Sequence, residues 1–185
     1  MYAVRHHRYQ PDEPVWRELH RYTNAELPPD IRPWLLDPSS LTARLIAASG
    51  GDFRVKVLQQ SWQRPRLSER QLLGMSDREL GIVREVELIC GGEPWVFARS
   101  VIPASSLQGR LRHLRKFKDS ALGAMLFSDP RMRRAAYEVA QIDGDARVIP
   151  PSLQARQLLW GRRSCFYLSG LPLMVSEIFL PAFRP

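Results

Sequence analysis

The amino-acid sequence predicts an α+β fold in which antiparallel strands are joined by tight hairpins and helices occur in separate runs. Two strand-like segments meet at a glycine turn near the middle of the chain, and a second such pair closes it. The 185 residues are 44% hydrophobic and 25% charged, which is an ordinary globular composition. This length favours one domain over residues 1–185, with 1–30 as an N-terminal extension.

The first third of the chain is expected to be helix and loop, because prolines interrupt it repeatedly. One short helix is expected over 15–22 and another over 41–48. Ser39 or Ser40 can cap the second helix, and the two glycines at 50–51 end it.

Strands are expected in the middle of the chain. Residues 53–59 alternate apolar and polar side chains, which predicts a half-buried strand. A polar stretch follows over 64–79. Residues 84–90 and 94–102 then form the clearest hairpin signal, with the glycine pair 91–92 as its turn.

The second half is expected to hold further helices and a closing hairpin. Helices are expected over three segments: 105–117, 122–127 and 131–141. A loop is expected over 142–151. The last hairpin joins strands over 165–168 and 173–180 through Ser169-Gly170.

Two charges have unusual places in these predicted strands. Arg84 shares a strand face with Val86, Leu88 and Cys90, and Glu177 is the only charge in the last strand. An inward arginine either pairs with a buried carboxylate of the protein or binds a substrate carboxylate through its planar fork. Likewise, Glu177 is either a core acid paired with an arginine or a pocket acid that handles a substrate hydroxyl.

Several classes of site have no support in the sequence. There is no GxSxG, HExxH, P-loop or GxGxxG motif, and the four histidines lie in polar or basic surroundings, so no metal site is expected. Cys90 and Cys165 form no CxxC pair, which fits a reducing cytoplasm. No apolar run is long enough for a secretory signal or a membrane span, so we expect a soluble cytoplasmic protein.

The net charge of +8 comes from 27 Lys and Arg against 19 Asp and Glu. It is densest over 110–118, which either contacts phosphates or forms a helix with a buried stripe of Leu111, Leu114 and Phe117 and a solvated basic face. We favour the solvated helix, because no zinc-finger or recognition-helix pattern accompanies the charge. A nucleic-acid partner is therefore not expected.

Several blocks of the sequence, in order, resemble the chorismate lyase family. They are WLLDPSSLT (34–42), REVELICGGEPWVFARSVIP (84–103), ALGAMLF (121–127), LWGRRS (159–164) with LSGLPL (168–173), and SEIFLP (176–181). The first block matches more loosely than the others. Together the blocks cover a little over half of the chain, and their shared order makes the resemblance specific.

This resemblance implies a single antiparallel sheet with helices packed on it and a buried product site closed by helical flaps. It also implies that chorismate is split into 4-hydroxybenzoate and pyruvate without a cofactor, at the start of the ubiquinone ring pathway. The substrate-carboxylate arginine of the family falls on Arg84, its hydroxyl-contacting acid on Glu177, and its two main-chain amide contacts on Leu41 and Leu122. The family often has methionine where this chain has Leu41, a difference of small consequence if only the backbone N–H is used.

The reaction creates an aromatic ring, so it needs positioning more than a strong nucleophile. Our hypothesis is that Arg84 holds the ring carboxylate while Glu177 orients the ring hydroxyl and assists proton movement. The expected partners are then chorismate and 4-hydroxybenzoate, with no nucleic acid, no stable membrane insertion and a monomeric state.

An alternative function is a non-catalytic effector-sensing module that binds a small aromatic acid, because some bacterial transcription regulators have ligand-sensing domains of this fold. Such regulators carry a winged-helix domain at their N-terminus. Only about thirty proline-rich residues precede the first matched block here, which is too few for that domain. The sequence therefore favours the enzyme.

Overall fold

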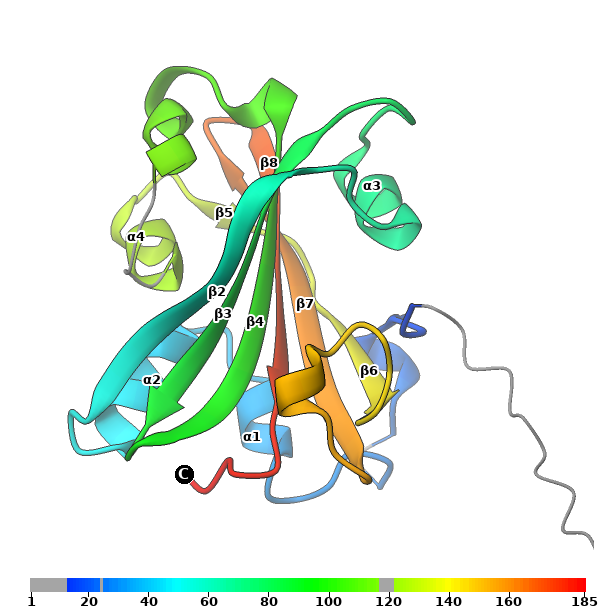
Figure 1. Ribbon diagram of the computed structural model, residues 1–185, viewed down its shortest axis with the longest axis vertical. Coiled ribbons are helices and arrows are strands. Elements are labelled where there is room, and N and C mark those ends of the chain that lie inside the picture. The colour runs from blue at the N-terminus through cyan, green and yellow to red at the C-terminus, as the bar shows by residue number, and fades with distance from the viewer. Residues whose placement is uncertain (1–12, 24, 117–121) are drawn as a thin grey trace, which may run out of the picture.

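A computed structural model describes residues 13–23, 25–116 and 122–185, and these form one antiparallel sheet with helices on both sides (Figure 1). The predicted fold class is therefore confirmed. The strand order is β1-β6-β7-β8-β4-β3-β2, and the short β5 also pairs with β7. The strands are β1 (Arg17–Glu18), β2 (Phe53–Gln63), β3 (Gly81–Cys90), β4 (Glu93–Pro103), β5 (Arg133–Arg134), β6 (Glu138–Asp143), β7 (Leu158–Leu168) and β8 (Leu171–Phe179).

The helices are short and lie between the strands. The α-helices are α1 (Arg32–Leu35), α2 (Leu41–Ala48), α3 (Leu67–Leu73) and α4 (Leu122–Ser128). The 3-10 helices are η1 (Leu19–Arg21), η2 (Ala104–Ser106), η3 (Gly109–Lys116) and η4 (Pro151–Leu153). No helix in the described ranges is long and apolar enough to cross a membrane.

Both predicted hairpins are confirmed, and each has the backbone that its turn residues favour. Gly91 and Gly92 have φ of 58° and 81° between β3 and β4, and Ser169 and Gly170 have φ of 52° and 81° between β7 and β8. Two successive residues with positive φ match the right-handed twist of the flanking strands. The strands are longer than predicted, because pairing with neighbours extends them beyond the local apolar pattern.

The predicted helix over 41–48 is confirmed as α2. The hydroxyl of Ser40 accepts a hydrogen bond from the backbone N–H of Ala43 at 3.4 Å, which makes Ser40 the cap. The chain then turns through Gly50 and Gly51, both with positive φ, into β2.

Two other predicted helices are wrong. Residues 131–141 form β5 and β6 instead, and within 15–22 only Leu19–Arg21 is helical, as the 3-10 helix η1 after the strand β1. The alanines and arginines of the first segment favour a helix locally, but β6 pairs with both β7 and β1 and buries Val139 and Ala140. These tertiary contacts outweigh the intrinsic helix propensity.

Two segments differ in detail from the prediction. The polar stretch 64–79 contains the helix α3, and the helix expected over 105–117 is built from η2 and η3. Leu111 and Leu114 are buried as the stripe predicted, whereas Phe117 lies outside the described residues. A three-residue apolar spacing matches the 3.0 residues per turn of a 3-10 helix, which explains the tighter winding.

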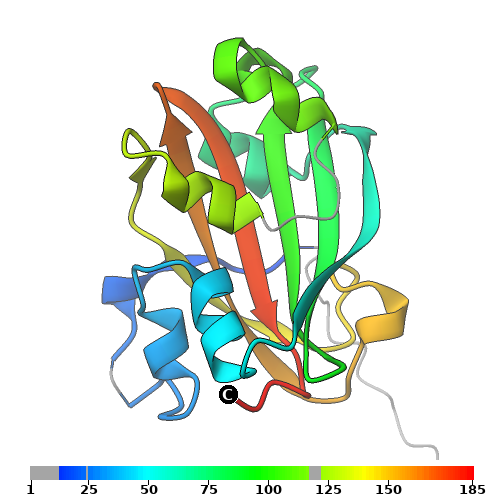
Figure 2. The same cartoon turned by 90° about the vertical axis from the view of Figure 1, so that its left-hand side faces the viewer.

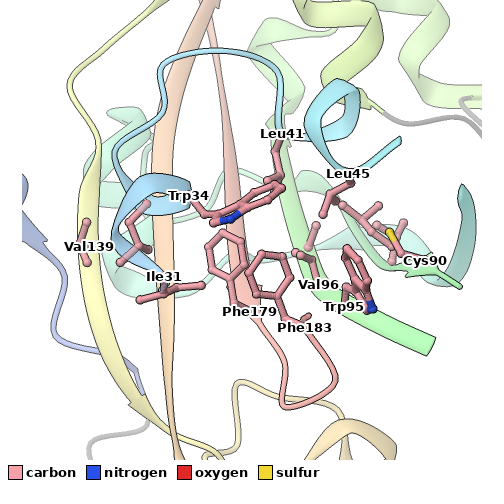
Figure 3. Packing of buried hydrophobic residues seen from close by; sticks show 14 of the residues in the cluster. Ile31, Trp34, Leu41, Leu45, Cys90, Trp95, Val96, Val139, Phe179 and Phe183 are labelled. Carbon is pink, nitrogen blue, oxygen red and sulfur yellow. The ribbon is translucent and has the colours of Figure 1, made fainter. Parts of the chain in front are cut away.

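An aromatic cluster lies at one end of the sheet, beneath α1 and α2. Trp34 and Phe183 meet edge-on with ring centroids 5.0 Å apart, and Phe179 and Trp95 pack on Phe183 from other sides (Figure 3). Because Trp34 lies in α1 and Leu41 begins α2, this cluster fixes the segment that leads into α2.

Candidate functional site

A pocket lies between one face of the sheet and the helices α2 and α4, which both cover that face (Figure 2). The empty space among its lining atoms is about 560 Å³, counting the part open to solvent. Most of its lining is apolar. The lining residues are Leu41, Thr42, Arg84, Val86, Leu88, Ala98, Ser100, Leu122, Gly123, Leu126, Phe127, Arg134, Arg162, Phe166, Val175 and Glu177. All four site residues expected from the sequence are among them.

Arg84 enters the pocket from β3, where its side chain is on the same face as Val86 and Leu88. Only 4% of Arg84 is exposed. The strand-parity argument therefore placed this guanidinium correctly. The opposite face of β3 is buried as well, because α3 covers Glu85 there.

Glu177 enters from β8 and is held by a second arginine. Its Oε2 accepts a hydrogen bond from Nε of Arg162 at 2.7 Å, and Arg162 lies directly opposite it on β7. The Arg162 side chain is 1% exposed, and Nη1 donates to the backbone carbonyls of Trp34 and Asp37 at 2.8 Å each. Glu177 is thus paired with an arginine, as one reading expected, and it also lines the pocket, as the other reading requires.

Small side chains separate the two expected site charges. On β4, Ser100 is opposite Arg84 and Ala98 is opposite Glu177. Two strand spacings and an offset of two residues place the Cα atoms of Arg84 and Glu177 about 12 Å apart. Because Ala98 and Ser100 are short, the floor between the two charges is low, and a flat ring can lie over it.

Leu41 and Leu122 are the first residues of α2 and α4, and both line the pocket. Backbone N–H groups in the first turn of a helix have no partner within the helix, so they can donate to a bound acceptor. The two helices approach closely: a Cβ on Gly123 would lie 3.1 Å from Oγ1 of Thr42. A Cβ at 123 would require the Thr42 side chain to give way by a few tenths of an ångström.

Sequence reasoning missed Arg162, although a signal for it exists. The two-residue turn Ser169-Gly170 fixes the β7–β8 register, which puts Arg162 opposite Glu177. It also missed Arg134, because the surrounding segment was predicted as a helix. In the structure Arg134 lies on β5, opposite Phe166 of β7.

Arg134 is held in place by several contacts. Its Nε donates to Oγ of Ser164 at 2.9 Å, and its Nη1 donates to the carbonyl of Pro38 at 3.2 Å. The guanidinium also lies over the rings of Tyr137 and Phe166. Burial, and next the positive charge of Arg162, lower the pKa of Arg134, while the charge of Glu177 opposes this shift.

The side chains in the described ranges offer little for other chemistry. No three of their His, Cys, Asp or Glu residues come together as a metal site requires. Cys90 and Cys165 are buried free thiols, and burial raises the pKa of both, which disfavours the nucleophilic thiolate. The arrangement can instead bind an anion at Arg84 and a hydroxyl at Glu177.

Sequence comparisons place relatives of this chain in one family. The profile of the family described as chorismate lyase matches residues 12–184. A protein of Azoarcus sp. (strain BH72), named a probable chorismate pyruvate-lyase, is 46% identical over 166 residues, covering 82% of this chain and 84% of that protein. One of the same name from Aromatoleum aromaticum is 42% identical over 180 residues, covering 94% and 96%.

Among solved structures, the effector domain of PhnF from Mycobacterium smegmatis has a similar fold. It superimposes with a TM-score of 0.56 at 16% sequence identity, covering 79% of this chain and 91% of that chain. At this identity the likeness concerns the fold alone.

Proposed function

Since the chain belongs to the chorismate lyase family, we propose that it uses the pocket under α2 and α4 to convert chorismate into 4-hydroxybenzoate and pyruvate. This reaction begins the ubiquinone ring pathway. The observation that carries the proposal is the placing of Arg84 and Glu177 in one mostly apolar pocket, separated by a low floor.

In the reaction, the bond between a ring carbon and the enolpyruvyl oxygen breaks. The neighbouring hydroxyl-bearing carbon loses a proton, and the enolpyruvyl methylene carbon gains one and becomes the methyl group of pyruvate. The ring becomes aromatic. The two products together contain all the atoms of chorismate, so no water, oxidant or reductant is consumed. The protein's task is to fix the substrate in the conformation from which this proton transfer is short.

Arg84 binds the ring carboxylate in this proposal, together with the backbone N–H groups of Leu41 and Leu122. A guanidinium offers two parallel donors to a carboxylate, and amides at helix starts favour negative charge. Burial of Arg84 supports this role, since a charge–charge contact gains strength where water is excluded.

Glu177 accepts a hydrogen bond from the ring hydroxyl at the other end and assists proton movement. Its contact with Arg162 uses Oε2, which leaves Oε1 for the substrate. Arg162 acts as a positioning residue: it holds Glu177 on the sheet and ties it to the segment that carries α2. Loss of Arg162 would therefore disturb both the acid and the cover of the pocket.

We further propose that the protein works as a cytoplasmic monomer without a nucleic-acid partner. Its two free thiols suit a reducing compartment, and Arg112 and Arg115 of η3 face solvent like an ordinary basic helix surface. Sedimentation of the purified protein, and titration with duplex DNA at several salt concentrations, test these two statements. A stable dimer, or DNA binding that weakens steeply with salt, would contradict them.

The main experiment is to mix the purified protein with chorismate, follow 4-hydroxybenzoate by ultraviolet absorbance and measure pyruvate in parallel. We expect both products in equal amounts, with no added metal or cofactor. Binding of 4-hydroxybenzoate without turnover of chorismate would instead favour the effector-sensing module, whose fold the protein shares.

A further inference from the structure

We propose that Arg134 binds the second carboxylate of chorismate, the one on the enolpyruvyl group, and so distinguishes substrate from product. This inference rests on the proposed function of the pocket. It assigns a substrate contact to a residue outside the four expected from the sequence.

The charge of the pocket is the first argument. Among its described lining residues, three guanidinium groups, those of Arg84, Arg134 and Arg162, face one carboxylate, that of Glu177. Arg162 donates hydrogen bonds to Glu177 and to two backbone carbonyls. Arg134 therefore adds a second cation to Arg84 in the pocket lining, and chorismate carries two carboxylates. 4-Hydroxybenzoate carries one.

The position of Arg134 is the second argument. Its Nε donates to Ser164, which lies two residues along β7 from Arg162, the partner of Glu177, so Arg134 lies toward the end of the pocket assigned to the ring hydroxyl. The enolpyruvyl ether of chorismate is on the ring carbon next to that hydroxyl. A substrate with its ring carboxylate on Arg84 and its hydroxyl on Glu177 therefore directs its second carboxylate to the same end.

The geometry of Arg134 is the third argument. Its hydrogen bonds to described residues use Nε and Nη1, and two aromatic rings hold the plane of its guanidinium. Nη2 makes none of these bonds. A guanidinium held by these contacts, in a residue that lines the pocket, is prepared for a carboxylate, because little side-chain freedom is lost on binding.

The test compares a dianionic with a monoanionic ligand in the same variants. For Arg134→Met, we expect the KM for chorismate to rise about 10- to 100-fold, since one charge-assisted hydrogen bond is lost. The Kd of 4-hydroxybenzoate, measured by calorimetric titration, should change by less than about threefold. Retained product binding also shows that the variant is folded.

Two further variants make the result decisive. Arg133→Met removes the neighbouring charge of β5, which is exposed and does not line the pocket, and should leave both constants unchanged. Arg134→Lys keeps a charge but loses the planar fork, so it should raise the KM for chorismate by a smaller factor and decide the case if Arg134→Met does not fold.

Two results would overturn the inference. In the first, folded Arg134 variants bind 4-hydroxybenzoate as poorly as chorismate, so the residue does not discriminate the ligands. In the second, neither constant changes. In both, wild-type turnover of chorismate leaves the proposed function intact, whereas absence of wild-type turnover refutes that function itself.

Discussion

The two faces of the sheet bury the same kinds of charged residue and use them differently. On the face away from the pocket, Arg99 donates to Glu69 of α3 at 2.7 and 3.0 Å and to Glu85 of β3 at 2.6 Å. On the pocket face, the neighbouring residue of β3 is Arg84, which faces Glu177 across the small side chains of β4.

The spacing of the charges explains the difference. A long side chain at position 99 reaches both acids directly, so these three charges pair with one another, next to a smaller hollow that Arg99 and Glu69 also line. Alanine and serine at positions 98 and 100 cannot bridge the corresponding gap on the other face, so a hollow remains there. Short neighbours around a buried arginine, as at Arg84, therefore leave room for a ligand.

The largest effect is expected for Arg84→Ala. Removing a desolvated charge contact to the substrate should cost about 3–5 kcal/mol of binding, or at least about a hundredfold in kcat/KM. Steady-state kinetics with chorismate measure this, and far-ultraviolet circular dichroism serves as the folding control. A variant within about threefold of wild type would remove Arg84 from the site.

Arg99→Ala provides the matched change on the opposite face. It leaves Glu69 and Glu85 without their shared partner, so the free energy of unfolding should fall by about 3–5 kcal/mol. Urea denaturation measures the loss, and kcat/KM of the folded fraction should change far less than in Arg84→Ala. If Arg99→Ala loses activity but keeps its stability, the two faces do not differ in the way described above.

Glu177→Gln tests the chemistry of the pocket face. The amide still accepts a hydrogen bond from Arg162 but cannot take up a proton, so kcat should fall about a hundredfold or more. Single-turnover and steady-state rates with chorismate distinguish a slower chemical step from weaker binding. An unchanged kcat with a raised KM would reduce Glu177 to a positioning group.

The smallest effect is expected for the pH dependence of the stability that Glu69 contributes. Burial opposes ionisation of this carboxyl, but the hydrogen bonds and charge of Arg99, with that of Arg66, outweigh it and lower its pKa. A lowered pKa stabilises the fold above the unfolded value, near pH 4.3, and this contribution is lost as the pH falls through the folded value.

We therefore expect the stability difference between wild type and Glu69→Gln to be greatest at neutral pH and to shrink in acid. Urea denaturation between pH 7 and pH 3 measures it, with the exposed Glu93→Gln as the control variant. A difference that is independent of pH would show that the ionised form of Glu69 does not stabilise this face.

Much of the fold follows from local patterns in the sequence. The two hairpins, helix α2 and its Ser40 cap are set by turn residues, apolar alternation and capping, all of which act over a few positions. The segments 131–141 and 15–22 were predicted wrongly because their strands exist only through pairing with β7 and β6, which lie far away in the sequence.

The same division applies to the pocket. The sequence by itself determined that Arg84 shares a face with apolar side chains, because alternation along a strand has a fixed period of two. Only the tertiary structure decided that β4 and β8 lie side by side, which puts Ala98 opposite Glu177 and opens the space between the charges. It likewise decided that Arg134 borders this pocket while Arg99 is enclosed by two acids, because strand order and helix docking join residues that no local pattern connects.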